Sequence, residues 1–426
     1  MIEEIKTELK KESEVIAWQI VKTNRRSSQL YATAYIPESV REVEQESYSV
    51  SLMVGKEDKE WIGESSFTLI SGQNVQEEVK AAVERARYVK NKSYTFPLPD
   101  ENNGYESRQI RSDALKVVEK VKKDYEKVKN LQGVKLSYYE IFVNNSQLQI
   151  VNSNGLTVGE QTSDIFTEFV LLSADEKHEI YHSLKSRGYE TLNLLEAIHD
   201  TAEMVRNTSL TQLAPTGKYN VLFSGETLDT LFNYFVSQSD AAGIYSGWSI
   251  FKEGETVIEN PQGEMLDIES DPTLPSMIGS TRFDGNGVTR KKVALIHKNV
   301  FSGITATQKY ACYTGKEATG PVGNIVVTAG NKSLDEIRKG KYLEVLQFST
   351  FEPNYITGAF SGEIRFAKLF DEEGNVSYIK GGSVSGKMLD AFKNASLSRE
   401  ITHHESYVGP KGVLLENISV AGEEAM

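Results

Sequence analysis

The chain has 426 residues, enough for two domains with separate cores, because a single hydrophobic core stops growing near roughly 250 to 300 residues. The sequence contains 47 Lys and Arg residues and 60 Asp and Glu residues. The resulting net charge of -13 argues against nucleic acid as a partner. No apolar run approaches the roughly 20 residues that cross a bilayer, and the charged amino terminus is unlike a signal peptide. A single cysteine fits a reducing compartment, so we expect a cytoplasmic protein without a membrane segment.

The first 213 residues alternate between helix and strand patterns. Ile2, Ile5 and Leu9 have helical spacing and predict a short amphipathic helix at the start. Short β-rich runs separated by polar turns fill residues 15–70, which predicts an antiparallel sheet. Further helices are predicted at 75–90, from about Arg111 to Lys129 and at 191–209, and further strands at 134–143, 147–152, 164–173 and 177–185.

A Pro and a Gly within residues 213–218 mark a change in sequence texture, so we predict domains at 1–213 and 214–426. After this boundary, residues 219–223 predict a strand, and Leu228 to Val236 has the spacing of a helix lying on a core. The remainder is β-rich and rich in glycine. Its predicted elements are strands at 341–349 and 362–370 and helices at 333–339 and 383–395.

These patterns predict an α+β fold. The amino-terminal domain should contain helices packed on an antiparallel sheet, and the carboxyl-terminal domain should be β-rich, either a sandwich or barrel-like.

Several glycine-centred segments carry a resemblance to a known family. They are the strand, turn and helix of 217–251 and the segments 151–156, 279–288, 355–365, 382–389 and 412–422. Together they resemble the TldD/PmbA family of zinc metallopeptidases, also called TldD/TldE.

The resemblance implies that, in the TldD branch, the helix after residue 225 carries an H-E-x-x-x-H motif. In that motif two His bind zinc and the Glu polarises a water. Here Phe232 and Ser237 occupy the two His positions and Asn233 occupies the Glu position. None of these side chains provides the motif's chemistry, so the sequence is similar to the PmbA (TldE) branch, which lacks the zinc motif.

The resemblance implies a noncatalytic PmbA/TldE-like subunit that pairs with a TldD-like catalytic subunit to process or degrade peptides. It places zinc in the partner and no cofactor in this chain, and it leaves a homo-oligomer open. A stand-alone peptide-binding module without catalysis is the alternative. Family names also mention modulation of DNA gyrase, which the negative net charge does not support.

A second motif, His178-Glu179-Ile-Tyr-His182, matches the H-E-x-x-H signature of zinc proteases. That signature needs a helix, whereas residues 177–185 alternate in the manner of a strand. On a strand the two imidazoles stand roughly 13 Å apart at about 3.3 Å per residue, too far to share one ion. A zinc peptidase that uses His178, Glu179 and His182 is therefore a third hypothesis, which this geometry disfavours.

Three other candidates have simpler interpretations. His403 and His404 are adjacent on an extended segment and point opposite ways, which predicts a surface or interface pair. Cys312 has no neighbouring His or basic cluster, so we predict a buried thiol and not a nucleophile. Residues 284–287 lack the ligand spacing of a calcium loop and predict a turn.

Overall fold

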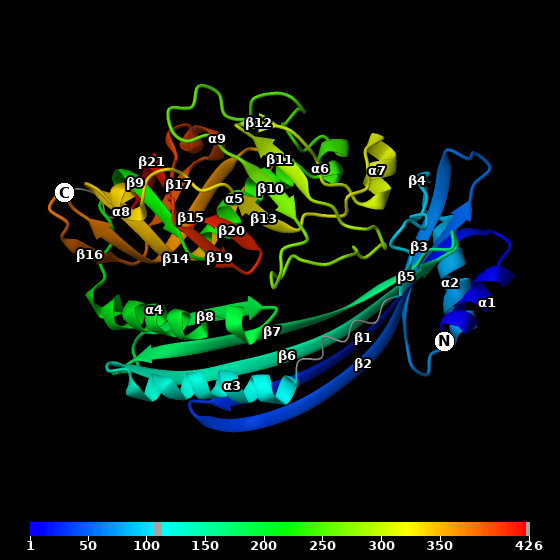
Figure 1. Cartoon of the computed structure of the whole chain (residues 1–426), viewed down its shortest axis with the longest axis horizontal. Helices are drawn as coiled ribbons and strands as arrows, with labels where there is room; N and C mark the ends of the chain where they lie inside the picture. The colour runs from blue at the N-terminus through cyan, green and yellow to red at the C-terminus, as the bar shows by residue number, and fades with distance from the viewer. Residues whose placement is uncertain (106–112, 423–426) are drawn as a thin grey trace.

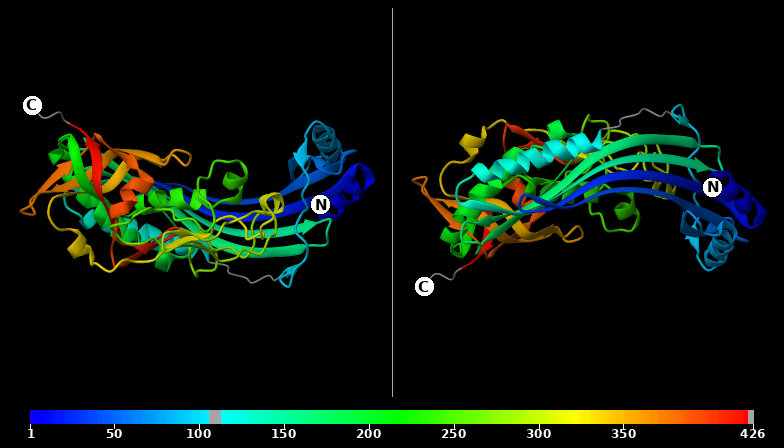
Figure 2. Two further views of the ribbon diagram at one scale, coloured as in Figure 1. Left: turned by 90° about the horizontal axis from the view of Figure 1, so that it is seen from above. Right: turned by 90° about the horizontal axis from the view of Figure 1, so that it is seen from below.

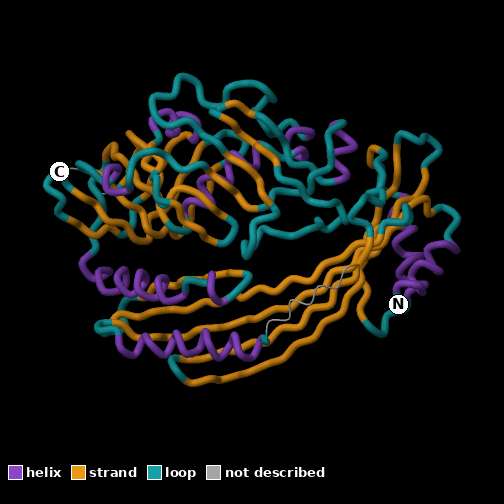
Figure 3. The backbone as a smooth tube through the Cα atoms, viewed as in Figure 1, coloured by secondary structure: helices purple, strands orange, loops and turns teal. Residues whose placement is uncertain are grey.

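The computed structural model describes residues 1–105 and 113–422. A long curved sheet runs beneath a β-rich carboxyl-terminal part (Figure 1), and the views from above and below show its strands extending along the molecule (Figure 2). The predicted α+β class is confirmed, with some helices lying on the long sheet and others within the carboxyl-terminal part (Figure 3). None of the helices in the described ranges has the length and apolar character needed to cross a membrane.

Within these ranges the first half of the chain forms an eight-stranded sheet of order β4-β3-β2-β1-β6-β7-β5, with β8 also paired to β7. Its long central strands are antiparallel, and Ile20 lies opposite both Val50 and Val151. The strands are β1 (Val15–Thr33), β2 (Ile36–Gly55), β3 (Trp61–Ile70), β4 (Asn91–Lys92), β5 (Gly104–Tyr105), β6 (Val134–Asn152), β7 (Thr157–Ser173) and β8 (Glu179–Ser186).

The two strands predicted at 134–143 and 147–152 are a single strand, β6. Its polar middle stays in the ladder because side chains on both neighbouring strands satisfy it. Arg25 Nε on β1 donates to Asn144 Oδ1 at 3.3 Å, and Asn144 Nδ2 donates to Asp164 Oδ2 on β7 at 2.8 Å. The polar residues in the middle therefore suggest a gap between two strands, although the strand is continuous.

Two groups of helices cover the sheet (Figure 1). Helices α1 (Ile2–Lys11) and α2 (Val75–Arg87) bury Ile5 and Val79 against β1, β2 and β3. Helices α3 (Ala114–Glu126) and α4 (Leu194–Asn207) share a second core with β6, β7 and β8. The predicted start of the third helix, Arg111, lies outside the described residues. Short 3-10 turns occur at η1 (Lys127–Asn130), η2 (Tyr189–Thr191) and η3 (Thr208–Leu210).

The carboxyl-terminal part contains a closed barrel, which confirms the barrel-like alternative. Strands run in the order β14-β9-β21-β17-β15, and β15 pairs again with β14 to close the ring. β16 lies outside the ring against β15, and β18 pairs with β21. The strands are β9 (Gly217–Ser224), β14 (Tyr342–Pro353), β15 (Ala359–Phe370), β16 (Val376–Ile379), β17 (Ser383–Lys387), β18 (Ser396–Leu397) and β21 (Gly412–Ala421).

Beside the barrel lies a sheet of order β12-β11-β10-β13-β20-β19. Its strands are β10 (Ile268–Asp271), β11 (Val293–His297), β12 (Val300–Phe301), β13 (Asn324–Val327), β19 (Ile401–His404) and β20 (Tyr407–Pro410). The helices of this half are α5 (Thr227–Gln238), α6 (Ala241–Tyr245), α7 (Gln308–Thr314), α8 (Leu334–Ile337), α9 (Met388–Ala391) and the 3-10 turn η4 (Phe392–Asn394).

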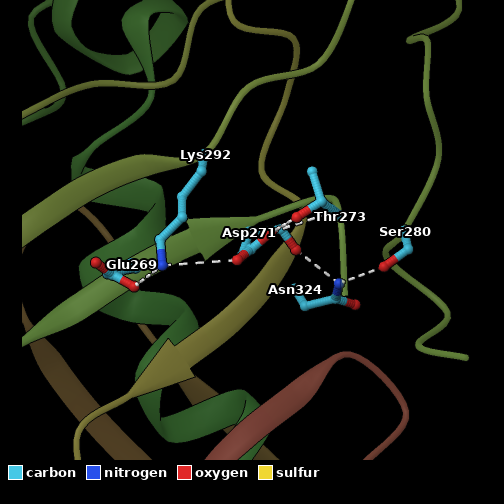
Figure 4. Close-up of polar contacts among 6 residues, drawn as sticks. All are labelled: Glu269, Asp271, Thr273, Ser280, Lys292 and Asn324. Carbon is cyan, nitrogen blue, oxygen red and sulfur yellow. Dashed lines mark hydrogen bonds and ion pairs between the residues drawn. The ribbon is translucent and has the colours of Figure 1, made fainter. Parts of the chain in front are cut away.

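A polar network ties this sheet to the loop that follows β10 (Figure 4). Asp271 Oδ1 accepts hydrogen bonds from the Thr273 backbone N–H at 2.8 Å and from its hydroxyl at 2.6 Å. Asn324 Nδ2 donates to the Asp271 carbonyl at 2.7 Å and to Ser280 Oγ at 2.8 Å. Lys292 Nζ lies 2.6 Å from a Glu269 carboxylate oxygen. The network therefore holds Ser280, near the start of the 279–288 segment, beside the ends of β10 and β13.

Two predictions for this half are wrong. Residues Ser383–Lys387 form strand β17, and the predicted helix begins only at Met388, because Ser385 pairs with Ser361 on β15 and with Ser419 on β21. Cys312 on α7 is exposed, since the helix turns this residue away from the packed alanine Ala311.

Two of the glycine-centred segments, 151–156 and 279–288, meet where the two halves of the chain pack together. Phe283 is buried in a cluster with Ile150, Leu156 and Val158. Asp284 Oδ1 accepts hydrogen bonds from two backbone N–H groups further along the segment, which confirms the predicted turn. Gly287 has φ +83, and a Cβ there would lie 2.6 Å from Leu156 Cδ2.

Replacing Gly287 with alanine should lower the free energy of unfolding by about 1 to 3 kcal/mol, from backbone strain and overpacking. Urea denaturation measures this loss. Gly285→Ala is the matched control, because a Cβ at Gly285 meets nothing within 4 Å. Equal losses for the two variants would contradict the close approach as the cause.

Candidate functional site

Helix α5 follows strand β9 through a tight turn, as the sequence predicts. Gly225 supplies a positive φ of 60, and Thr227 Oγ1 donates to the Ser224 carbonyl at 2.7 Å at the start of the helix. The apolar stripe predicted for this helix is fully buried, as seen at Leu228 and Leu231. The helix is therefore anchored in the core of the carboxyl-terminal half.

Phe232 points into this core. Its ring stacks on Tyr407 with centroids 5.7 Å apart and meets Phe392 edge-on at 5.8 Å. The side chain is completely buried. The residue therefore packs in an aromatic cluster and offers no ligand atom.

Asn233 and Ser237 lie one helical turn apart on a different face of α5, and both line a pocket. Asn233 Nδ2 donates to the hydroxyl of Tyr355 at 3.3 Å. The three positions singled out by the resemblance therefore separate into one core residue and two pocket residues.

This α5 pocket has a volume of about 710 Å³, within the range of ligand-binding pockets. It is bounded by α5, α6, α7 with the segments on either side of it, and the end of β14. Its rim exposes large apolar side chains, with Trp248 61% exposed, Ile356 58% and Tyr355 43%. The lining residues are Asn233, Val236, Ser237, Gln238, Asp240, Ala242, Gly243, Trp248, Ser249, Thr305, Thr307, Tyr310, Pro321, Val322, Glu352, Pro353, Asn354, Tyr355 and Ile356.

Gln238, at the end of α5, connects two walls of the α5 pocket. Its Nε2 donates to the Tyr355 carbonyl, and its Oε1 accepts from the Ile250 N–H at 2.8 Å. Its own carbonyl accepts from Ser249 Oγ at 2.7 Å. Because this buried side chain satisfies two loops at once, it fixes the shape of the pocket.

The α5 positions do not fit a zinc ion. Zinc in proteins takes thiolate, imidazole or carboxylate ligands, whereas Phe232, Asn233 and Ser237 supply a phenyl ring, an amide and a hydroxyl. Across residues 1–105 and 113–422, no three His, Cys, Asp or Glu side chains are grouped so that they could hold a metal ion.

The H-E-x-x-H segment lies on a strand. Glu179 and His182 belong to β8, opposite Leu172 and Phe169 of β7, and His178 precedes the strand. The predicted strand is confirmed, so His178 and His182 do not share one face of a helix.

His182 instead belongs to a partly buried group of titratable side chains between the two halves. Burial, with a smaller contribution from His404, lowers the pKa of His182 to about 4. Burial also lowers the pKa of His404, against the opposing effect of Asp229, and raises the pKa values of Asp229 and Glu226. His403 is exposed and His404 is partly buried, so the two side chains point to opposite sides of the strand, as the sequence predicts.

Sequence reasoning missed this group because β8, α5 and β19 supply its members from positions far apart in the chain. No local spacing connects them. The only signal was the alternation that turned His404 inward.

The carboxyl-terminal half contains the closed barrel, the β9–α5 unit and the α5 pocket. This half, residues 216–422, matches the PmbA/TldA metallopeptidase C-terminal domain. Residues 216–422 therefore carry a domain of the PmbA/TldA type, and the chain is similar to PmbA and TldE proteins over most of its length.

Two relatives and one solved structure illustrate this similarity. An uncharacterized protein of Methanocaldococcus jannaschii is 24% identical over 280 residues, which cover 62% of this chain and 65% of that protein, just under two thirds. Metalloprotease PmbA of Escherichia coli O157:H7 is 22% identical over 392 residues, 85% of this chain and 83% of that protein. TldE from Thermococcus kodakarensis has the same fold, with a TM-score of 0.80, 17% identity and coverage of 99% of this chain and 100% of that one.

Proposed function

We propose that this chain is a noncatalytic PmbA/TldE-like subunit that assembles with a TldD-like zinc peptidase and acts in peptide processing or degradation. The observation that carries the proposal is the character of α5, where Phe232 packs in an aromatic cluster and Asn233 and Ser237 supply only an amide and a hydroxyl. In a family named for metallopeptidases, this donor set favours a chain whose partner holds the zinc. The net charge of -13 and the single cysteine favour a cytoplasmic assembly without nucleic acid.

An open strand edge supports assembly with another chain. Within the described residues β3 pairs with β2 only from Ser47 to Gly55, whereas β2 begins at Ile36. The free part exposes Ile36 (72%), Val40 (60%) and Val43 (42%). Exposed apolar side chains on an open edge favour the addition of a strand from a partner or an extended peptide.

Co-expression with a TldD-like chain tests the proposal. We expect a stable mixed oligomer with peptidase activity, and size-exclusion chromatography with a peptidase assay measures both. We expect the isolated chain to hold no stoichiometric zinc by metal analysis, and His178→Ala to leave the metal content unchanged. A homomer that degrades casein-like substrates, or a full equivalent of zinc that is lost in His178→Ala, would overturn the proposal.

A second candidate is a stand-alone peptide-binding module without catalysis. The exposed apolar rim of the α5 pocket favours it, because such patches usually mark interaction sites. This function requires that the isolated chain binds peptides and that it neither associates with a TldD-like chain nor changes that chain's activity.

A further inference from the structure

The charged side chains that line the α5 pocket are all acidic. Asp240 and Glu352 are the acidic members, and the lining contains no Lys or Arg. Neither carboxylate forms an ion pair with a Lys, Arg or His within residues 1–105 and 113–422. The α5 pocket therefore carries negative charge that the described part of the chain does not neutralise.

Asp240 is held in a defined position. It directly precedes α6, and its Oδ1 accepts a hydrogen bond from the Ala242 N–H at 3.2 Å as the amino-terminal cap. Burial raises the pKa of Asp240, against the hydrogen bond from Ala242, which lowers it. A cation near Asp240 would offset the free-energy cost of burying its negative charge, because charges in a partly buried site are screened less than on the surface.

The walls around these carboxylates are apolar and aromatic. Trp248, Tyr355 and Ile356 are exposed at the rim although exposed apolar area is unfavourable, and Tyr310 of α7 lines the wall. Aromatic faces bind apolar side chains and also attract cations. Gln238 connects the two loops that carry Tyr355 and Ile250, so these surfaces are arranged before any ligand arrives.

We propose that the α5 pocket binds a peptide segment in which an apolar side chain lies next to a lysine ammonium. That the ligand is a peptide rests on the proposed function, whereas the charge preference rests on Asp240 and Glu352. The apolar side chain lies against the aromatic wall and the cation approaches the carboxylates. An acidic peptide of the same shape is repelled.

Isothermal titration calorimetry on the full isolated chain tests this preference with three blocked dipeptides, acetyl-Phe-Lys-amide, acetyl-Phe-Gln-amide and acetyl-Phe-Glu-amide. At low ionic strength we expect the lysine peptide to bind about tenfold more tightly than the glutamine peptide, and the glutamate peptide to bind most weakly. In 1 M salt, where the Debye length is about 3 Å, the advantage of the lysine peptide should shrink.

The double variant Asp240→Asn, Glu352→Gln removes both charges and keeps the side-chain shapes, and asparagine retains the cap of α6. In this variant the lysine and glutamine peptides should bind equally. Glu77→Gln on α2 is the matched control and should leave the preference unchanged. Trp248→Ala should weaken binding of all three peptides, because it removes part of the apolar wall.

The proposal is overturned if none of the peptides binds, if the glutamate peptide binds as well as the lysine peptide, or if the double variant keeps the preference. These measurements need no partner. If no mixed oligomer forms, the subunit role is rejected but the charge preference still holds. If a mixed oligomer forms but the isolated chain shows no preference for the lysine peptide, only this inference is rejected.

Discussion

Replacing Phe232 with alanine will lower the free energy of unfolding by about 3 to 5 kcal/mol, the usual cost of deleting a fully buried phenyl ring. The ring stacks on Tyr407 and meets Phe392 edge-on, so its removal leaves a cavity that rigid aromatic neighbours cannot fill. Urea denaturation followed by circular dichroism measures the loss.

Asn233→Ala is the control for this experiment, because the next residue of the same helix lines the α5 pocket and is only partly buried. Its effect should stay below about 1 kcal/mol, since substitutions away from the packed core are usually mild. If both variants lose the same stability, the ring of Phe232 is not the packing centre that its contacts indicate.

The second large effect concerns pH. His182 should make the free energy of unfolding fall by about 3 kcal/mol between pH 6.5 and about 4. In the unfolded chain its pKa is near 6.5, whereas burial, helped by His404, lowers it to about 4 in the folded chain. Between these values only the unfolded state takes up the proton, so stability is complete above pH 6.5 and is lost as the pH falls.

His182→Leu should remove this part of the pH dependence, because leucine suits the contact with Phe169. Asp229 and Glu226 act in the opposite direction, since burial raises their pKa values and favours the folded state at low pH. The difference between the wild-type and variant profiles therefore isolates His182. The exposed His403→Leu is the control, and identical profiles for the wild type and His182→Leu would contradict the assignment.

The spacing of apolar residues correctly predicted those helices and strands that pack one face against a single core. The apolar stripe from Leu228 to Val236 predicted α5 because every residue on that face packs against the same core. Strict alternation likewise predicted β8 around Glu179 and His182 against the zinc signature. The pattern failed where contacts with adjacent strands determine the structure. Asn144 stays in a strand because its side chain forms hydrogen bonds with Arg25 and Asp164.

The α5 pocket was less accessible from sequence. The helical spacing of Asn233 and Ser237 puts both on one face, but the opposing walls come from Tyr310, Glu352 and Tyr355, far along the chain. The group around His182 and His404 has the same origin. The spacing of apolar residues predicts each helix or strand separately. It does not predict which side chains from different elements come together in a site.

The aromatic packing of Phe232 also limits how this protein can change. A Phe232→His substitution would set a polar ring among Phe235, Phe392 and Tyr407, which present hydrocarbon surfaces to it. An imidazole buried without hydrogen bonds is costly, so installing a single ligand here would unbalance the core before any metal arrived. Building a metal-binding helix here would therefore require replacement of the aromatic neighbours together with Phe232.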